Sequence, residues 1–139
     1  ETYYKKLLDM TRQYQLNDRV EFLPYTTNTE GLYRNASIVV LPSKTEGCSN
    51  VILESYMYGR ICLLSDIEPN RAVGSENQRY FPTDSAKMLA KIIIEILSLD
   101  KETVQNIVNE NHKYLINNFS MDFMVKKYEK IFEEIFYQK

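Results

Sequence analysis

The sequence predicts an α/β fold, a Rossmann-like parallel sheet with flanking helices. The first observation is that two strand-sized runs, residues 38–41 and 61–64, are continuously apolar rather than alternating, which is typical of parallel strands covered on both faces. The second is that segments with helical spacing of apolar residues lie between and after the strand-sized runs, as they do in α/β domains. No internal repeat or Pro/Gly/Ser-rich linker interrupts the chain, so residues 1–139 are interpreted as one domain.

Four strands are expected, because two further runs rich in β-branched or aromatic residues resemble the first two. Three of the four runs stop at a proline, and the fourth stops at Ser65 and Asp66. The predicted strands are residues 20–23, 38–41, 61–64 and 79–81. Ligands of an open parallel sheet bind outside the carboxyl ends of the strands, so any chemistry is expected in the loops that follow them. These loops are residues 24–28, 42–49, 65–77 and 82–85.

Helices are predicted before the first strand, between the strands and at the end of the chain. Thr27 and Glu30 have the spacing of a capping box, which predicts a short helix over residues 31–35. Gly59 follows the helix-like residues 50–58 and is expected just past a helix end. Apolar residues at three- and four-residue spacing predict three more helices, over residues 85–97, 100–118 and 120–137. The expected order is helix, strand, helix, strand, helix, strand, loop, strand, and then three helices.

Composition excludes several classes of protein. With 44% apolar residues and a net charge of −2 the chain is globular, and 17 Lys and Arg against 19 Asp and Glu leave no basic excess to bind a nucleic-acid backbone. One histidine and two cysteines predict neither a metal site nor a disulfide framework. No apolar run approaches the ~20 residues of a membrane span, so a cytoplasmic setting is expected. The chain begins at Glu1 rather than Met, which suggests a piece of a longer protein.

The loop at residues 42–49 carries the clearest signal of a binding site. It leads from a buried strand into a helix, and such a junction leaves free backbone N–H groups around Cys48 to Val51, backed by the positive end of the helix dipole. This arrangement suits a phosphate. Gly47 removes a side chain where a ligand would have to approach the backbone.

Two glutamates belong to the same junction. Glu54 is the only charge in an otherwise apolar or uncharged helix, so it must find a partner. Helical side chains tilt toward the N-terminus, so Glu54 leans over Asn50 and toward the loop that holds Glu46. Carboxylates accept hydrogen bonds from sugar hydroxyls, so a phosphate site beside them describes a nucleotide or sugar nucleotide. From these residues alone a structural role is equally open, with Glu46 favouring the helix dipole and Glu54 pairing with an Arg or Lys.

The same region resembles a known family. Residues 32–43 (LYRNASIVVLPS) and 46–54 (EGCSNVILE) resemble the C-terminal domain of the retaining, nucleotide-sugar-dependent glycosyltransferases of family 4 (glycosyl transferases group 1), which have the GT-B fold. Two glutamates separated by seven residues are that family's E-x7-E signature. Supporting similarity covers nearly the whole chain. Residues 19–23 resemble the family's "drV-x-F" strand and residues 64–71 its "sDi...hrE" turn, while residues 80–82 resemble its "lyF" strand and residues 119–121 its "fsw" helix start.

The resemblance implies roles for individual residues. Glu54 would bind the ribose hydroxyls of the donor, and Glu46, the catalytic candidate, would lie beside the donor sugar and contact its ring hydroxyls. Tyr25 and Thr26 would lie against the base, although Pro24 stands where the family usually has glycine. Backbone amides would bind the sugar hydroxyls and the diphosphate, at Gly47, Cys48, Ser49, Asn50 and Val51.

The resemblance also implies the whole reaction, the transfer of a hexose from a nucleoside diphosphate sugar to a hydroxyl of a saccharide or lipid-linked acceptor. The product would be a surface polysaccharide or another glycoconjugate, and no cofactor or metal is expected. Residues 1–139 would be the N-terminally truncated C-terminal half of the GT-B fold. The acceptor domain and the family's basic Arg/Lys pair would lie upstream, so this fragment alone is expected to be inactive. The full-length protein is expected in the cytoplasm, with peripheral contact to the inner face of the membrane allowed.

Two other interpretations stay open at this stage. Where the family's turn commonly has a glutamate this chain has Ala72, so a non-catalytic interaction domain that keeps the fold is an alternative. A receiver or dinucleotide-binding domain fits the strand order loosely, but no G-x-G-x-x-G follows a strand and no acidic pair ends an early one.

Overall fold

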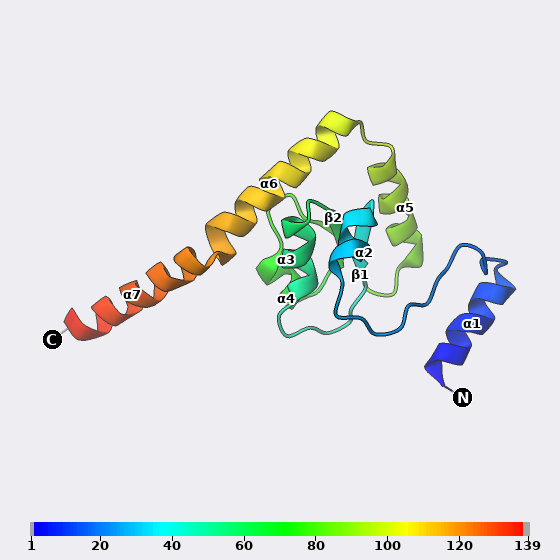
Figure 1. The fold of residues 1–139 in the computed structure, drawn as a ribbon, viewed down its shortest axis with the longest axis horizontal. Coiled ribbons are helices and arrows are strands. Elements are labelled where there is room, and N and C mark those ends of the chain that lie inside the picture. The colour runs from blue at the N-terminus through cyan, green and yellow to red at the C-terminus, as the bar shows by residue number, and fades with distance from the viewer. Residues whose placement is uncertain (1, 138–139) are drawn as a thin grey trace.

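The computed structural model describes residues 2–137 and has an α/β architecture (Figure 1). A small sheet lies at the centre with helices around it, and the two terminal helices point away from this body. The elements are α1 (Tyr3–Gln13), α2 (Glu30–Asn35), β1 (Ile38–Leu41), α3 (Asn50–Met57), β2 (Ile61–Ser65), α4 (Glu68–Val73), β3 (Arg79–Phe81), α5 (Ala86–Leu97), α6 (Lys101–Phe119) and α7 (Met121–Tyr137).

The sheet has three parallel strands in the order β1-β2-β3, which confirms the predicted parallel arrangement. Ile38 of β1 pairs with Ile61 of β2, and Leu63 of β2 pairs with Arg79 of β3. All five residues of the central strand β2 are buried, as its continuous apolar character predicts. The residues of β1 are only half-buried, because β1 is an edge strand in this sheet.

The strand predicted at residues 20–23 is wrong. This segment has no regular secondary structure, and Val20 and Leu23 are exposed. Phe22 lies instead against α1, with its ring centroid 5.6 Å from that of Tyr4 in an edge-to-face contact. A strand requires a second backbone to pair with, and no strand of the described residues pairs with this segment.

Most of the predicted helix boundaries are confirmed. Gly59 follows α3 with a φ of 66°, a left-handed conformation that favours glycine. Ser85 caps α5 by accepting a hydrogen bond from the backbone N–H of Met88, and Asp100 caps α6 by accepting one from Thr103.

Two details of the helices differ from the prediction. The capping box of Thr27 and Glu30 is wrong, because α2 begins at Glu30 itself and its N-cap is Thr29, which makes no side-chain capping bond. The segment that forms α4 was predicted to be part of the loop at residues 65–77. Its sequence signal is Pro69 in the first turn, where the missing proline N–H costs no helical hydrogen bond.

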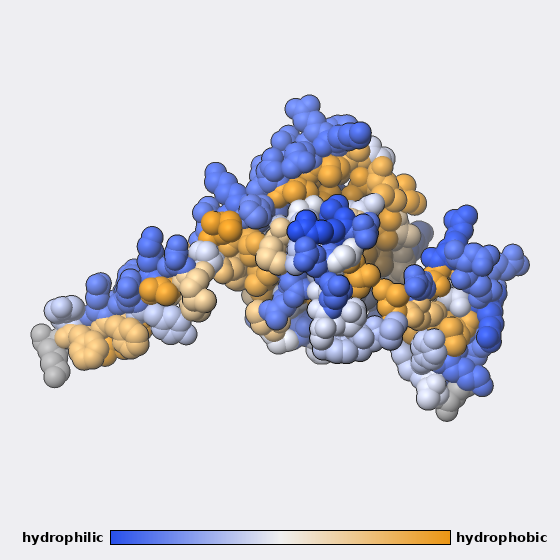
Figure 2. Space-filling model, in the orientation of Figure 1, coloured by the Kyte–Doolittle hydropathy of each residue, from blue (hydrophilic) through white to orange (hydrophobic). Residues whose placement is uncertain are grey.

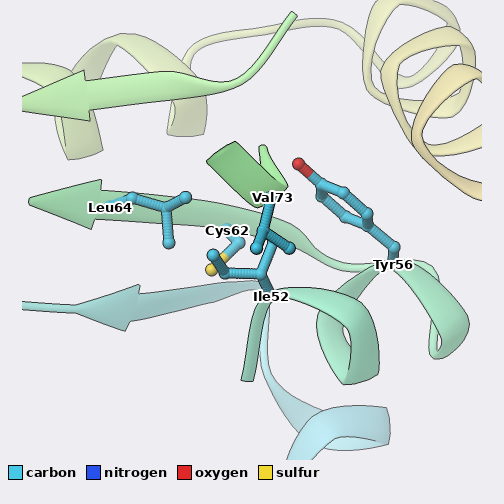
Figure 3. Close-up of a cluster of buried hydrophobic side chains, with 5 residues drawn as sticks. All are labelled: Ile52, Tyr56, Cys62, Leu64 and Val73. Atoms are coloured by element: carbon cyan, nitrogen blue, oxygen red, sulfur yellow. The ribbon is translucent and has the colours of Figure 1, made fainter. Parts of the chain in front are cut away.

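The core lies on both faces of β2. Side chains alternate along a strand, so Cys62 and Leu64 face α3 and α4 while Ile61 and Leu63 face the opposite side. Figure 3 shows the first cluster, in which side chains from α3, β2 and α4 meet at Ile52, Tyr56, Cys62, Leu64 and Val73. The second cluster packs under α5 and comprises Ile61, Leu63, Phe81, Ile92 and Ile96. These two clusters hold the carboxyl edge of the sheet in place.

The terminal helix α7 extends beyond this body and buries none of its residues. Its apolar side chains lie along one side and its polar side chains along the other (Figure 2). No helix among the described residues is long and apolar enough to cross a membrane.

Candidate functional site

The candidate site lies at the carboxyl edge of the sheet, where the loops after β1, β2 and β3 meet. Because the three strands are parallel and paired in register, their C-terminal ends at Leu41, Ser65 and Phe81 face the same side. The loop after β1 runs through Glu46 and Gly47 into α3. The fold therefore places the predicted anion site at the edge where parallel sheets bind ligands.

The N-terminus of α3 is open to a ligand. Its N-cap, Ser49, is buried and extended but makes no side-chain capping bond, and the first turn of α3 contains no acidic residue. The backbone N–H groups of the first turn therefore have no side-chain acceptor, and no acidic side chain in that turn neutralises the positive end of the helix dipole. Cys48 and Asn50 are exposed. A Cβ at Gly47 would meet no atom within 4 Å, so the space over this backbone is free.

Glu46 is held by a series of hydrogen bonds that begins inside the fold. The amide of Asn70 in α4 donates to the carbonyl oxygen of Ser65, at 2.9 Å, and to its hydroxyl, at 3.1 Å. The Ser65 hydroxyl donates to the carbonyl oxygen of Ser43 in a short bond. The Ser43 hydroxyl in turn donates to Oε1 of Glu46, at 2.5 Å. A buried strand end thus fixes a half-buried carboxylate on the loop.

Glu54 is half-buried and finds its partner in α2, not in a basic residue. The hydroxyl of the buried Tyr33 donates a hydrogen bond to Glu54, and the Tyr33 ring stacks on Tyr58 with centroids 5.4 Å apart and planes at 16°. Burial, followed by the hydrogen bond and the negative charge of Glu54, raises the pKa of Tyr33 well above its ordinary value. The tyrosine therefore stays protonated and keeps its donor at physiological pH.

Neither carboxylate forms an ion pair with a Lys or Arg in residues 2–137. This contradicts the structural interpretation, in which Glu54 pairs with an Arg or Lys side chain. The two glutamates are instead satisfied by neutral hydroxyl donors. A neutral donor fixes the position of a carboxylate and leaves its negative charge and remaining lone pairs available. Both groups can therefore accept further hydrogen bonds from the hydroxyls of a ligand.

Two charged pairs flank the site. Lys44 pairs with Asp84, with Nζ 2.8 Å from Oδ2, and joins the loop after β1 to the loop after β3. Arg71 binds Asp66 through two hydrogen bonds, of 2.5 and 2.9 Å, and lowers the pKa of that carboxyl. The Arg71 guanidinium also lies 4.7 Å from the ring centroid of Tyr80. These pairs are exposed, so they shape the rim of the site more than they stabilise the fold.

In the described part of the chain, the two residues predicted to contact the nucleotide base form no hydrogen bond, ion pair or ring contact with this site. Tyr25 is 92% exposed. The Thr26 hydroxyl accepts a hydrogen bond from the backbone N–H of Asn28, at 3.1 Å, within its own turn. Ala72, where the resembling family has glutamate, is exposed on α4.

Of the two cysteines, Cys48 is exposed within the site and Cys62 is buried in the core; neither forms a disulfide. Burial raises the pKa of the Cys62 thiol to about 11. In residues 2–137 no group of three or more His, Cys, Asp or Glu side chains is arranged to hold a metal ion.

The residues that support the glutamates were missed by the sequence analysis. They are Tyr33, Ser43, Ser65 and Asn70. A weak signal existed for two of them, because a serine stands at the end of each of two neighbouring predicted strands, in Pro42-Ser43 and Leu64-Ser65. Neighbouring parallel strands end at the same edge, so these serines could have been expected to lie close together. No local pattern marks Asn70 or Tyr33.

Comparison with known proteins gives consistent matches. The model of the family described as Glycosyl transferases group 1 matches residues 1–131. The O-antigen biosynthesis glycosyltransferase WclY of Escherichia coli is 21% identical over 130 residues, which are 94% of this chain and 36% of WclY.

Solved structures share the fold. HepE of Anabaena, in complex with UDP-glucose, has a TM-score of 0.82 at 18% identity, over 94% of this chain and 36% of HepE. A glycosyltransferase from Rickettsia africae has a TM-score of 0.85 at 19% identity, over 98% of this chain and 37% of that protein. The chain thus spans about a third of the length of the proteins it matches.

Proposed function

The chain belongs to the glycosyl transferases group 1 family and has the fold of the C-terminal part of GT-B glycosyltransferases, and from this we propose that it forms the donor-binding part of a retaining glycosyltransferase. The complete protein transfers a sugar from a nucleoside diphosphate sugar to a hydroxyl acceptor. The observation that carries this proposal is the open start of α3, with its uncapped N–H groups and two carboxylates held by neutral donors.

The proposed assignment of groups follows from their chemistry. The amides from Gly47 to Val51 and the dipole of α3, equivalent to about half a positive charge, suit the diphosphate. Carboxylates repel phosphate but accept hydrogen bonds from hydroxyls, so Glu54 takes the ribose and Glu46 takes the donor sugar. Tyr25 and Thr26 remain the proposed contacts of the base.

The proposed reaction breaks the bond between the anomeric carbon and the β-phosphate oxygen. The acceptor oxygen forms its bond to the anomeric carbon on the same face, so the configuration is retained. The proton of the acceptor hydroxyl passes to the departing β-phosphate oxygen, and the products are a glycoside and a nucleoside diphosphate. Amides aimed at the diphosphate lower the barrier because negative charge accumulates there as the bond breaks.

Two relatives support a choice of substrates to test first. HepE was solved with UDP-glucose, and we therefore propose a uridine diphosphate hexose as the first donor to try. WclY is described as an O-antigen biosynthesis enzyme, which supports a saccharide or lipid-linked acceptor in surface polysaccharide synthesis. The cytoplasmic location and a peripheral contact with the inner face of the membrane stay predictions.

The test is titration calorimetry of the chain with UDP, GDP, ADP and their hexose conjugates. The wild-type chain is expected to bind one of these nucleotides. Glu54→Gln is expected to weaken that binding about tenfold, because the neutral amide still accepts a hydrogen bond but contributes about 0.5–1.5 kcal/mol in place of the about 1.5–3 kcal/mol of a charged acceptor. Glu129→Gln is the matched control, since Glu129 is exposed on α7. If neither the wild-type chain nor the full-length protein, which would also carry the upstream Arg/Lys pair, binds any of these nucleotides, the proposal is contradicted and the non-catalytic interaction domain is favoured.

A further inference from the structure

We propose that Asn70, Ser65 and Ser43 form a positioning relay that holds Glu46 for the sugar part of the donor. The relay is the series of hydrogen bonds from the Asn70 amide through Ser65 and Ser43 to the Glu46 carboxylate. This inference rests on the proposed function, because it presumes that Glu46 contacts the donor sugar. It adds three residues that do not touch the ligand but decide where Glu46 stands.

The relay is anchored in the buried interior of the protein. Asn70 and Ser65 are both 0% exposed, and Ser65 ends the fully buried strand β2. The Asn70 amide makes two bonds to Ser65, and the opposite orientation would place Oδ1 against the Ser65 carbonyl oxygen, with two acceptors facing each other. Burial strengthens these hydrogen bonds and makes their removal costly, although Oδ1 of Asn70 is itself buried without a hydrogen-bond partner among the described residues. The Asn70 amide occupies an acceptor site of the Ser65 hydroxyl, and the proton of that hydroxyl is left to donate to the Ser43 carbonyl oxygen.

The loop that carries Glu46 needs such an anchor. Between β1 and α3, Lys44, Thr45 and Gly47 are exposed, and the loop has no regular secondary structure. The other side-chain link from this loop to the rest of the fold, the pair of Lys44 with Asp84, joins two largely exposed side chains. Exposed pairs of this kind contribute little. The bonds through Ser43 are therefore the main restraint on the position of Glu46.

The chemistry of the last link fits a group that must bind a sugar. The Ser43 hydroxyl occupies one lone pair of Glu46 Oε1, at 2.5 Å. A carboxylate offers about four acceptor sites, so the others remain for hydroxyls of the donor. The relay therefore fixes the geometry of Glu46 without neutralising its charge. Through Glu46 the relay affects binding of the donor sugar and not binding of the nucleotide, and the test depends on this difference.

The experiment compares affinities for UDP and UDP-glucose, and for GDP with GDP-mannose and ADP with ADP-glucose, by titration calorimetry of the chain. The wild-type chain is expected to bind the sugar conjugate of its nucleotide more tightly than the nucleotide alone. Ser43→Ala is expected to weaken binding of the sugar conjugate about five- to tenfold and to leave binding of the nucleotide within about twofold, because Ser43 affects the ligand only through the position of Glu46. Ser43→Thr keeps the hydroxyl and is expected to restore most of the difference.

Controls separate the outcomes. Thr45→Ala, at an exposed position of the same loop, is expected to change neither affinity. Asn70→Ala tests the buried end and is expected to show the same selective loss; Ser43→Ala covers the case in which that variant does not fold. If Ser43→Ala lowers the affinity for the nucleotide and for its sugar conjugate equally, or changes neither affinity, the relay is refuted while the proposed donor site stands. If neither the wild-type chain nor the full-length protein binds a nucleotide, the proposed function is refuted and the relay with it.

Discussion

Deletion of the Tyr56 hydroxyl is expected to destabilise the helix that presents Glu54. Tyr56 is 0% exposed in α3, and its hydroxyl donates to Oε1 of Gln78, at 2.7 Å, and accepts from the backbone N–H of Ser75, at 3.0 Å. The Ser75 hydroxyl continues the network to Oδ1 of Asn111 in α6, at 2.6 Å. The network thus ties α3 to the segment before β3 and to α6.

The magnitude follows from the groups that Tyr56→Phe leaves without a partner. The ring stays in place, so no cavity forms, but the Ser75 N–H and the Gln78 oxygen lose their partner in the buried interior. An orphaned buried polar group costs about 1–3 kcal/mol, so the two groups together are expected to lower the free energy of unfolding by about 2–6 kcal/mol. This is a large part of the 5–15 kcal/mol that is roughly typical of whole domains.

Urea denaturation followed by circular dichroism measures the loss. With a slope of about 2 kcal/mol per molar urea, the midpoint is expected to fall by about 1–3 M at unchanged slope. Tyr4→Phe is the matched control, because Tyr4 is 55% exposed and its ring contact with Phe22 survives; its change is expected within about 0.5 kcal/mol. A midpoint for Tyr56→Phe equal to that of the control would refute the view that this network stabilises α3.

Three further outcomes are expected. Tyr33→Phe removes the hydroxyl donor of Glu54 and is expected to weaken nucleotide binding about five- to tenfold in calorimetry; an unchanged affinity contradicts the assigned support. Gly74→Ala places a Cβ in steric overlap with the Tyr80 hydroxyl and is expected to lower the free energy of unfolding by about 1–3 kcal/mol; an unchanged urea midpoint would contradict this expectation. Burial raises the pKa of Cys62 from 9.0 to about 11, so the stability linked to this thiol is fully present below pH 9 and is lost as pH rises toward 11. Between pH 8 and pH 10.5 the free energy of unfolding is expected to fall less in a Cys62→Ala variant than in the wild-type chain. An equal fall in both would show that this thiol does not cause the pH dependence.

Much of the architecture could be predicted because its determinants are local. The apolar run at residues 61–64 and the helical spacing over residues 85–97 and 100–118 are properties of neighbouring residues, and the structure confirms the strand and the two helices. Residues 20–23 have the composition of a strand, but pairing depends on a second backbone that composition does not specify. The helix α4 was missed because its six residues are too few to show a period.

The candidate site divides in the same way. Glu46, Glu54 and the helix start between them lie within one stretch of sequence, so their spacing reveals them. The residues that support them are not close together in the sequence. The bond from Ser65 to Ser43 joins residues 22 apart, and Tyr33 reaches Glu54 from a different helix. Residues that recognise a ligand can be marked by a motif, whereas those that position them become visible only when the chain is folded.

The two glutamates are supported from different sides of the site by the same kind of donor. Tyr33 holds Glu54 from α2 through a buried ring stacked on Tyr58, and the relay from Asn70 holds Glu46 from β2 and α4. An Arg or Lys in either place would neutralise the carboxylate and leave a weaker acceptor for hydroxyls. A hydroxyl donor keeps the charge, and that charge is compatible with a nearby diphosphate only if the carboxylates stay directed at hydroxyls while the α3 amides take the phosphate. In the proposed complex the fixed geometry of both supports would keep the two carboxylates near the diphosphate and directed away from it, which a neutralising Arg or Lys would not do while leaving them strong acceptors.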